Sequence, residues 1–426
     1  MLVAFLVALF GFILLNIPIA FALLLTAVVL MLLSSGIEPA IMTQSLVRGI
    51  DNFPLMAIPF FMLAGEIMNE GGISRRIVEF ARALVGHVTG GLGYVGVVAS
   101  MIFAGVSGSA VADTSAIGSI LLPIMDKEGY DKIKSTALIS AAGTIGPIIP
   151  PSIPMILYGV VAGVSIVKLF LGGIIPGILI GIGLMIMWYF HAKKQGYKAD
   201  RKASVREVLH SGKSAFWALI LPIIILAGII TGIYTPTEAG VIAVVYAFLV
   251  GLFGYRELKL TRMPGVLSAA VKSTAIVLLL CGAATSAAYL ITTAQIPTML
   301  TNTLMSWSGG NPIIGMFLIN ILLLIVGAVM DLTPALLILA PILLPIVTGF
   351  GLDPIYFGVV LVVNLCIGLI TPPVGTVLYV GCGLSKLSIG QMVKPILGFA
   401  SVMVVVLFII TYIPELILFI PNAVGR

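Results

Sequence analysis

The sequence predicts an all-α, polytopic membrane protein, and its composition and long apolar runs are the basis for that prediction. Of the 426 residues, 60% are hydrophobic and only 9% are charged, whereas about a quarter of the residues of an ordinary soluble domain carry a charge. The mean hydropathy is +1.23, and many long stretches lack lysine and arginine, which is typical of membrane-spanning helices. No run alternates polar and apolar side chains over about ten residues, so a transmembrane β-barrel is not expected.

Ten membrane crossings and two re-entrant hairpins account for the apolar segments. The stretches 89–125 and 311–347 are each too long for one helix and have a polar, Gly-rich or Pro-containing centre. We therefore interpret both as hairpins that enter and leave the membrane on the same side. The ten predicted crossings are 2–15, 18–34, 54–69, 135–162, 169–190, 215–233, 236–254, 273–292, 354–384 and 395–420.

The basic residues support this topology. Seven of the 22 lie between residues 191 and 213, and with the amino terminus outside, 19 of the 22 fall on the inner side. The remaining three, Arg48, Lys168 and Arg426, fall outside. Because lysine and arginine accumulate in cytoplasmic loops, we expect a periplasmic amino terminus and interpret the basic loop as a topology signal, not a nucleic-acid site. The first basic residue is Arg48, so a cleaved signal peptide is not expected.

Cysteine and histidine give no indication of a disulfide framework, a metal site or a cofactor. The cysteines are odd in number and lie in apolar segments, which is not the pattern of a disulfide-stabilised fold. The histidines all fall outside the predicted spans, so a histidine proton relay is not expected. These residues are Cys281, Cys366, Cys382, His87, His191 and His210.

The second half of the chain repeats the first at an offset of 222 residues. The pair Pro150–Pro151 recurs as Pro372–Pro373, and "ILLP" at 120–123 recurs at 342–345. Two blocks that share one offset without a gap indicate an internal repeat. Each half contains five crossings and one hairpin, and because five is odd, the second half enters the membrane inverted. The predicted halves are 1–213 and 214–426.

Each half also contains a helix interrupted by prolines, in the predicted spans 135–162 and 354–384. The interruptions read "GPIIPPSIP" at 146–154 and "LITPPVGTVLY" at 369–379. Proline removes a backbone donor and pushes the preceding residue out of helical geometry, and broken backbone at membrane depth is tolerated where it lines a cavity. Inverted repeats with interrupted helices indicate a secondary transporter whose site lies where the interruptions meet, with carbonyls facing a cation and helix amino termini facing an anion. The alternative is a packed, inert proline kink.

The hairpin centres carry the candidate polar chemistry. "GVSGSAVADTS" at 105–115 offers hydroxyl and carbonyl oxygens, which suit Na⁺, and Ser109 is expected to cap the returning helix. Asp113 and Asp331 fall at the two centres, where an intramembrane carboxylate could neutralise Na⁺, accept a proton or cap a helix. Glu238, beside "YTPTEAG", is interpreted as a cap or boundary residue.

Two other classes of protein fit the sequence less well. "GVSG" at 105–108 matches the pattern of rhomboid proteases, but no histidine lies within a span to activate Ser107, so an enzyme is not expected. An anion channel is a second alternative, because re-entrant loops also build filters. No lysine or arginine lies between 273 and 385, so an anion would be held by hydroxyls, helix amino termini and bound cations. That arrangement favours a Na⁺-coupled carrier, and a proton-coupled organic anion carrier stays open.

At these residues the sequence resembles the large membrane subunit (DctM type) of TRAP transporters, the tripartite ATP-independent periplasmic family. The resemblance covers essentially the whole chain and leans towards the sialic acid branch. The motifs that carry it are "FAGVSGSAVADTSAIGSILLP" (103–123), "GTIGPIIPPSIPMILYG" (143–159), "MDLTPALLILAPILLP" (330–345) and "LITPPVGTVLY" (369–379).

The resemblance implies an elevator-type carrier in the bacterial inner membrane. Hairpins and broken helices would form a moving transport domain, and the amino-terminal helices of each half would form a scaffold. The family imports organic acids, such as sialic acids and C4-dicarboxylates, with a Na⁺ gradient. A periplasmic binding protein delivers the small carboxylate substrate, and a small four-helix membrane subunit packs on the scaffold; here that subunit is expected as a separate chain.

The resemblance and the repeat also assign site residues. The first Na⁺ site would use Ser107, Ser109, Gly146, Ile149 and Pro151. By the repeat, the second Na⁺ site would use Gly327, Met330, Thr333, Gly368 and Thr371. The substrate would lie between them, near Asp113, Thr114, Thr144, Ser152 and Thr376.

Overall fold

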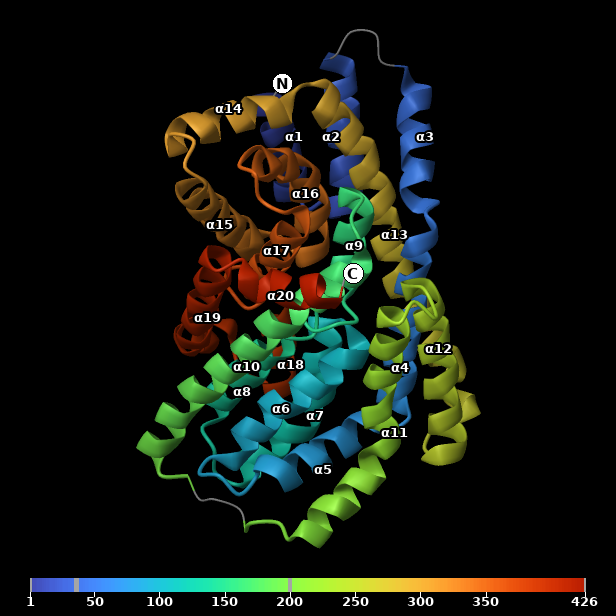
Figure 1. Cartoon of the computed structure of the whole chain (residues 1–426), viewed down its shortest axis with the longest axis vertical. Helices are drawn as coiled ribbons and strands as arrows, with labels where there is room; N and C mark the ends of the chain where they lie inside the picture. The colour runs from blue at the N-terminus through green and yellow to red at the C-terminus, as the bar shows by residue number, and fades with distance from the viewer. Residues whose placement is uncertain (1, 34–37, 198–200, 425–426) are drawn as a thin grey trace.

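The computed structural model describes residues 2–33, 38–197 and 201–424, and the regular structure within these ranges is helical throughout (Figure 1). The predicted all-α class is therefore confirmed. Seven helices are long and apolar enough to cross a membrane, or eight if the bent pair 39–50 and 53–70 is one span. Five of the seven overlap with predicted crossings, and the other two, Pro312–Val329 and Leu332–Gly349, make up the stretch interpreted as the second hairpin. The remaining predicted crossings fall on the bent pair, on shorter helices or on pairs of shorter helices. Three residues used in the predictions lie outside the described residues. These are residue 34, which ends a predicted crossing, and the basic residues Lys198 and Arg426, which were assigned to a side of the membrane.

Each half of the chain contains ten α-helices among the described residues. In the first half they are α1 (Leu2–Leu14), α2 (Ile19–Leu33), α3 (Pro39–Ile50), η1 (Phe53–Met56), α4 (Ala57–Glu70), α5 (Ile73–Val85), α6 (Gly91–Ser107), α7 (Ala110–Lys127), α8 (Lys132–Gly143), α9 (Ile153–Ala162) and α10 (Ile166–Gln195). In the second half they are α11 (Val205–Ile230), α12 (Pro236–Leu249), η2 (Val250–Gly254), η3 (Leu260–Arg262), α13 (Met263–Thr293), α14 (Ile296–Ser308), α15 (Pro312–Val329), α16 (Leu332–Gly349), α17 (Pro354–Gly368), α18 (Thr376–Ser385), α19 (Ile389–Tyr412) and α20 (Glu415–Val424).

Helix boundaries in the two halves keep the 222-residue spacing of the sequence motifs. Helix α16 begins and ends 222 residues after α7, and α14 lies within one residue of the same spacing from α5. The stretches interpreted as hairpins are the helix pairs α6–α7 and α15–α16, and the interrupted stretches are the pairs α8–α9 and α17–α18. In Figure 1 α14 lies at the top and α5 near the bottom, with α15–α16 above the centre and α6–α7 below it. The two hairpins thus approach the middle of the molecule from opposite ends.

Several boundaries differ from the predictions for identifiable reasons. The predicted span 395–420 is wrong as one helix, because Pro414 cannot continue α19 and Ile413 before it leaves helical geometry at φ −126°. Three helices that mix polar with apolar residues were not predicted: α3, α5 and α14. Arg48 therefore lies on a helix, α3, and not in a loop. His191 and His210 lie on α10 and α11, which extend beyond the spans predicted for them.

Helices α8 and α17, the first halves of the two interrupted segments, form the centre of the core. Every residue of α8 from Ser135 onward and every residue of α17 from Tyr356 onward is buried. A buried side-chain network fixes α17 to its neighbours: Asn364 donates to Asn320 of α15 at 2.8 Å, and Asn320 donates to Thr411 of α19 at 3.0 Å. Because buried polar groups are costly without partners, this network holds α17 in one position behind the second interruption.

Candidate functional site: two hairpin tips and two broken helices

The first hairpin tip packs directly on the first interruption. Gly108 joins α6 to α7 at φ +62°, a left-handed conformation that favours glycine, and a Cβ there would lie 2.6 Å from the carbonyl oxygen of Pro151. Ser109 then starts α7, accepting a hydrogen bond from the backbone N–H of Ala112 at 3.4 Å, so its predicted capping role is confirmed. Glycine at 108 lets the tip backbone reach the backbone of the broken helix.

Asp113 is the most unusual side chain of this tip. It is completely buried, and one carboxylate oxygen accepts a hydrogen bond from the Ser107 hydroxyl. Its other oxygen, Oδ2, has no hydrogen-bond partner among the described residues, and a Cβ on Gly146 would collide with it. An unpaired oxygen of a buried carboxylate is costly, so this position calls for a cation or a proton. Asp113 is not a cap, which removes one of its three predicted roles.

Two hydroxyls of the first interruption form hydrogen bonds with nearby backbone groups. The Ser152 hydroxyl donates to the carbonyl of Pro147 and accepts from the N–H of Met155 at 3.2 Å, which starts α9. The Thr144 hydroxyl donates to its own helix at Ala141, 2.7 Å away. Both side chains are buried, so their hydroxyls hold the broken helix in shape.

The second tip packs on the second interruption through paired glycines. A Cβ on Gly368 would collide with the backbone of Gly327, and the N–H of Val374 donates to the carbonyl of Ala328 at 3.1 Å. Asp331 precedes α16 but makes no capping hydrogen bond there. Its carboxylate instead accepts from the Thr376 hydroxyl at 2.9 Å. The carboxylate of the second tip is therefore linked to the second broken helix.

A cavity of about 100 Å³ lies where the two tips and two interruptions meet. We call it the central cavity. The first residues of four helices line it: Ala110 of α7, Ile153 of α9, Leu332 of α16 and Thr376 of α18. Helix amino termini carry partial positive charge and free N–H groups. Among the described residues its lining contains one carboxylate, Asp331, and no lysine or arginine. An anion there would therefore meet backbone dipoles, and a cation or a proton would have to offset the Asp331 carboxylate.

The central cavity contains some of the predicted site residues and not others. Ser109, Thr333 and Thr376 line it. Met62 of α4 and Val277 of α13 also line it and were missed, because an apolar side chain within a predicted span carries no distinguishing signal.

The other predicted residues lie around or behind the central cavity. Thr114 is buried against Gly143, and its hydroxyl has no hydrogen-bond partner among the described residues. The Ile149 side chain packs on Gly177 of α10, and Thr371 donates to the carbonyl of Ile367 at 2.7 Å. Met330 is buried at the end of α15.

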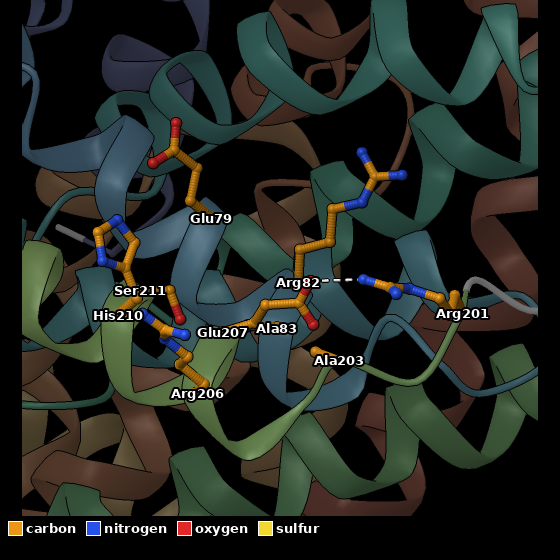
Figure 2. A pocket seen from close by; sticks show the side chains of 9 residues that line it. All are labelled: Glu79, Arg82, Ala83, Arg201, Ala203, Arg206, Glu207, His210 and Ser211. Atoms are coloured by element: carbon orange, nitrogen blue, oxygen red, sulfur yellow. Dashed lines mark hydrogen bonds and ion pairs between the residues drawn. The ribbon is translucent and has the colours of Figure 1, made fainter.

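A larger cavity of about 550 Å³ lies elsewhere, between α5 and the start of α11 (Figure 2). Its side chains are charged and partly solvated: Arg201 pairs with Glu207 at 2.5 Å while its own side chain is 82% exposed. None of its lining residues belongs to a hairpin or an interrupted helix, so we interpret it as a surface crevice beside the basic loop. The lining residues are Glu79, Arg82, Ala83, Arg201, Ala203, Arg206, Glu207, His210 and Ser211.

Comparison with known proteins identifies the family. Residues 6–416 match the family described as "Tripartite ATP-independent periplasmic transporter, DctM component". A putative TRAP transporter large permease protein of Haemophilus influenzae is 50% identical over 98% of both chains. The 2,3-diketo-L-gulonate TRAP transporter large permease protein YiaN of Escherichia coli is 47% identical over 97% of both chains. The sialic acid TRAP transporter large permease protein SiaM of Vibrio cholerae is 39% identical over 97% of this chain and 96% of its own.

The solved structures extend the likeness to the fold. The YdaH transporter of Alcanivorax borkumensis superposes with a TM-score of 0.62 at 16% identity, over 92% of this chain and 96% of that one. At that identity the likeness concerns the fold alone. The match over residues 6–416 and the identities of up to 50% make this chain a multi-pass membrane protein of the DctM component family of TRAP transporters, a transporter permease and not an enzyme.

Proposed function

We propose that this protein is the membrane subunit that carries an organic acid into the cell together with Na⁺. The convergence of four helix amino termini on the central cavity, without lysine or arginine, is the observation that carries the proposal. Such a cavity suits a carboxylate, because backbone N–H groups and helix dipoles bind anions without a fixed positive side chain. The relatives named for 2,3-diketo-L-gulonate and sialic acid also act on organic acids. A C4-dicarboxylate is the other candidate substrate class.

Na⁺ supplies the positive charge that the central cavity lacks. The unpaired oxygen of Asp113, the Ser107 hydroxyl and the nearby backbone of Gly146 form an oxygen-rich position that fits a hard cation. Ser109, Ile149 and Pro151 complete the ligand set that the family resemblance implies for this site. The corresponding set in the second half is Gly327, Met330, Thr333, Gly368 and Thr371. A proton on Asp113 would satisfy the same oxygen, which is the proton-coupled alternative.

Transport follows an elevator movement of two inverted halves, predicted as 1–213 and 214–426. Helix α11 (Val205–Ile230) runs across the predicted boundary, so we assign the whole of it to the second half. The tips and interruptions contact each other closely, so the pairs α6–α7, α8–α9, α15–α16 and α17–α18 move as one body. Helices α1–α4 and α11–α13 form the scaffold, which contributes Met62 and Val277 to the central cavity. A rigid body that carries its ions and substrate past a fixed wall exposes them first on one side of the membrane and then on the other.

The chain works with two partners in the bacterial inner membrane and periplasm. A small four-helix membrane subunit packs on the scaffold, and a periplasmic binding protein delivers the substrate to the outer face. One relative, the isethionate TRAP transporter permease protein DctMQ of Oleidesulfovibrio alaskensis, is longer, and this chain aligns with 64% of its length. The amino terminus lies on the periplasmic side, as the distribution of basic residues predicts.

Uptake into proteoliposomes tests the function directly. The chain is reconstituted with its small subunit, and the binding protein is added outside with labelled 2,3-diketo-L-gulonate, N-acetylneuraminate or succinate. We expect saturable uptake of one acid under an inward Na⁺ gradient and none when K⁺ replaces Na⁺. Uptake driven equally by a pH gradient without Na⁺ would favour the proton-coupled carrier, and non-saturable current would favour a channel.

A further inference from the structure

Two more cavities flank the central cavity on opposite sides. The first, about 360 Å³, lies between α4, α13 and the first hairpin, towards the base of that hairpin. The second, about 230 Å³, lies between α3, α13, the far end of α9 and the second hairpin. The first hairpin has its base on the side of the basic loop, so we call these the inner and the outer cavity.

The inner and outer cavities are built from equivalent positions of the two halves. Four pairs of lining residues are separated by the 222-residue spacing of the repeat. These pairs are Met62 with Ala284, Glu66 with Ala288, Ser115 with Leu337, and Arg48 with Ala270. Each cavity lies between the scaffold and one hairpin, so each is a candidate path from the central cavity to one side of the membrane.

The two cavities carry opposite charges. Within the part of the chain that the structure describes, Glu66 is the one charged side chain lining the inner cavity and Arg48 is the one lining the outer cavity. The position equivalent to each is an alanine that lines the other cavity, Ala288 for Glu66 and Ala270 for Arg48. The repeat therefore places equivalent elements around both cavities, while the charged side chain of each cavity stands at a different position and has the opposite sign.

Neither charge is used to stabilise the fold. Among the residues that the structure describes, Arg48 and Glu66 form no ion pair and no side-chain hydrogen bond, whereas Glu70, one helical turn after Glu66, pairs with Arg262. Glu66 lies on the apolar helix α4, where a charge is costly unless it has a partner or a function, and Arg48 is exposed on the more polar helix α3. A guanidinium presents a planar donor fork that binds a carboxylate bidentately, and a carboxylate repels one, more strongly where water is scarce.

We propose that Arg48 is the first binding residue for the substrate carboxylate on the outer side, and that Glu66 promotes its release on the inner side. This inference rests on the proposed import of an organic acid. It adds the residues that favour binding of the acid on the outer side and its release on the inner side. Arg48 attracts the carboxylate towards the helix amino termini of the central cavity. Once the moving body faces inward, Glu66 stands across the inner cavity from Ser107 and Ser109 and destabilises the bound anion.

Uptake kinetics of three cavity variants and two controls test the pair. Initial rates are measured in the reconstituted system against the concentration of substrate-loaded binding protein, using whichever of the three labelled acids the wild-type chain transports. Arg48→Gln should raise the half-saturating concentration about tenfold or more, the size of one lost charged hydrogen bond, with the maximal rate within twofold. Arg48→Lys should recover part of the loss. Glu66→Gln should lower the maximal rate and leave the half-saturating concentration within twofold.

Matched controls separate these effects from a general change of charge. Lys168→Gln removes a basic residue on the predicted outer side but outside the cavity, and it should retain the wild-type half-saturating concentration. Glu70→Gln removes the neighbouring carboxylate, and it should retain the wild-type maximal rate. If Arg48→Gln also retains it, or if both cavity variants change the maximal rate alone, the inference is overturned while the proposed function stands. If the wild-type chain transports none of the acids, the proposed function and the inference fall together.

Discussion

Replacing Gly108 by alanine should destabilise the chain in two ways. Alanine is strained in the left-handed conformation, and its methyl group clashes with the broken helix against which the hairpin tip packs. Gly108 has φ +62°, and a Cβ there would lie 2.6 Å from the Pro151 carbonyl oxygen and 3.2 Å from the Ile153 nitrogen. A left-handed conformation costs a non-glycine residue about 1–2 kcal/mol, and forcing a methyl group into packed surroundings adds about 1–3 kcal/mol. Both obstructing atoms are backbone, so no rotamer change relieves the contact. We expect Gly108→Ala to lower the free energy of unfolding by about 2–5 kcal/mol.

Gly129 provides the matched control. It has φ +79° in the turn between α7 and α8, and a Cβ there would meet nothing within 4 Å. Gly129→Ala should therefore cost only the conformational part, about 1–2 kcal/mol. The assay is denaturant unfolding of both variants in the same detergent, followed by tryptophan fluorescence, with uptake measured in parallel. Equal losses of stability in the two variants would refute the contact between the tip and the first interruption.

Three other substitutions test the geometry of the site and its supports. Asp113→Asn keeps the side-chain shape and removes the charge, so uptake should lose its dependence on Na⁺; an unchanged half-saturating Na⁺ concentration would count against Asp113 as the cation partner. Thr376→Val removes the 2.9 Å hydrogen bond to Asp331 and should lower the free energy of unfolding by about 1–3 kcal/mol. Thr376→Ser keeps the hydroxyl and should be close to wild type in the same denaturation assay. Trp188→Phe removes the 2.8 Å hydrogen bond from the indole N–H to the Gly90 carbonyl at the base of the first hairpin. Because that carbonyl loses its partner, the free energy of unfolding should fall by about 1–3 kcal/mol. A variant as stable as wild type would show that water replaces the indole as the donor.

The backbone of the site was predictable because prolines and glycines act locally. Pro150–Pro151 and Pro372–Pro373 fall within the interruptions, and Gly108 falls at a tip, as the sequence predicts. Ser109 caps α7 and Glu238 forms a capping box with Thr235, both as expected from position alone. Each of these assignments depends on a residue and its chain neighbours, which is why one sequence sufficed.

The contacts across the chain were not predictable in the same way. Asp331 lies 45 residues from Thr376, and no local pattern indicates that its carboxylate bonds to Thr376 instead of capping α16. Thr144 and Ser152 lie at the first interruption, as predicted, but their hydroxyls bond to nearby carbonyls. Glu66 did carry a signal, a carboxylate inside the predicted span 54–69, and that signal was overlooked.

The most direct test of the central claim is thermal unfolding of the purified chain in detergent across a Na⁺ titration, with K⁺ or choline holding the ionic strength constant. A ligand that binds only the folded state stabilises it by about 2.7 kcal/mol at a hundredfold excess over its dissociation constant. We predict a rise in melting temperature that is selective for Na⁺ and is lost in Ser107→Ala, because we propose Asp113 and the Ser107 hydroxyl that donates to it as the first cation position. An identical response to Na⁺ and K⁺ would contradict Na⁺ coupling at the hairpin tips.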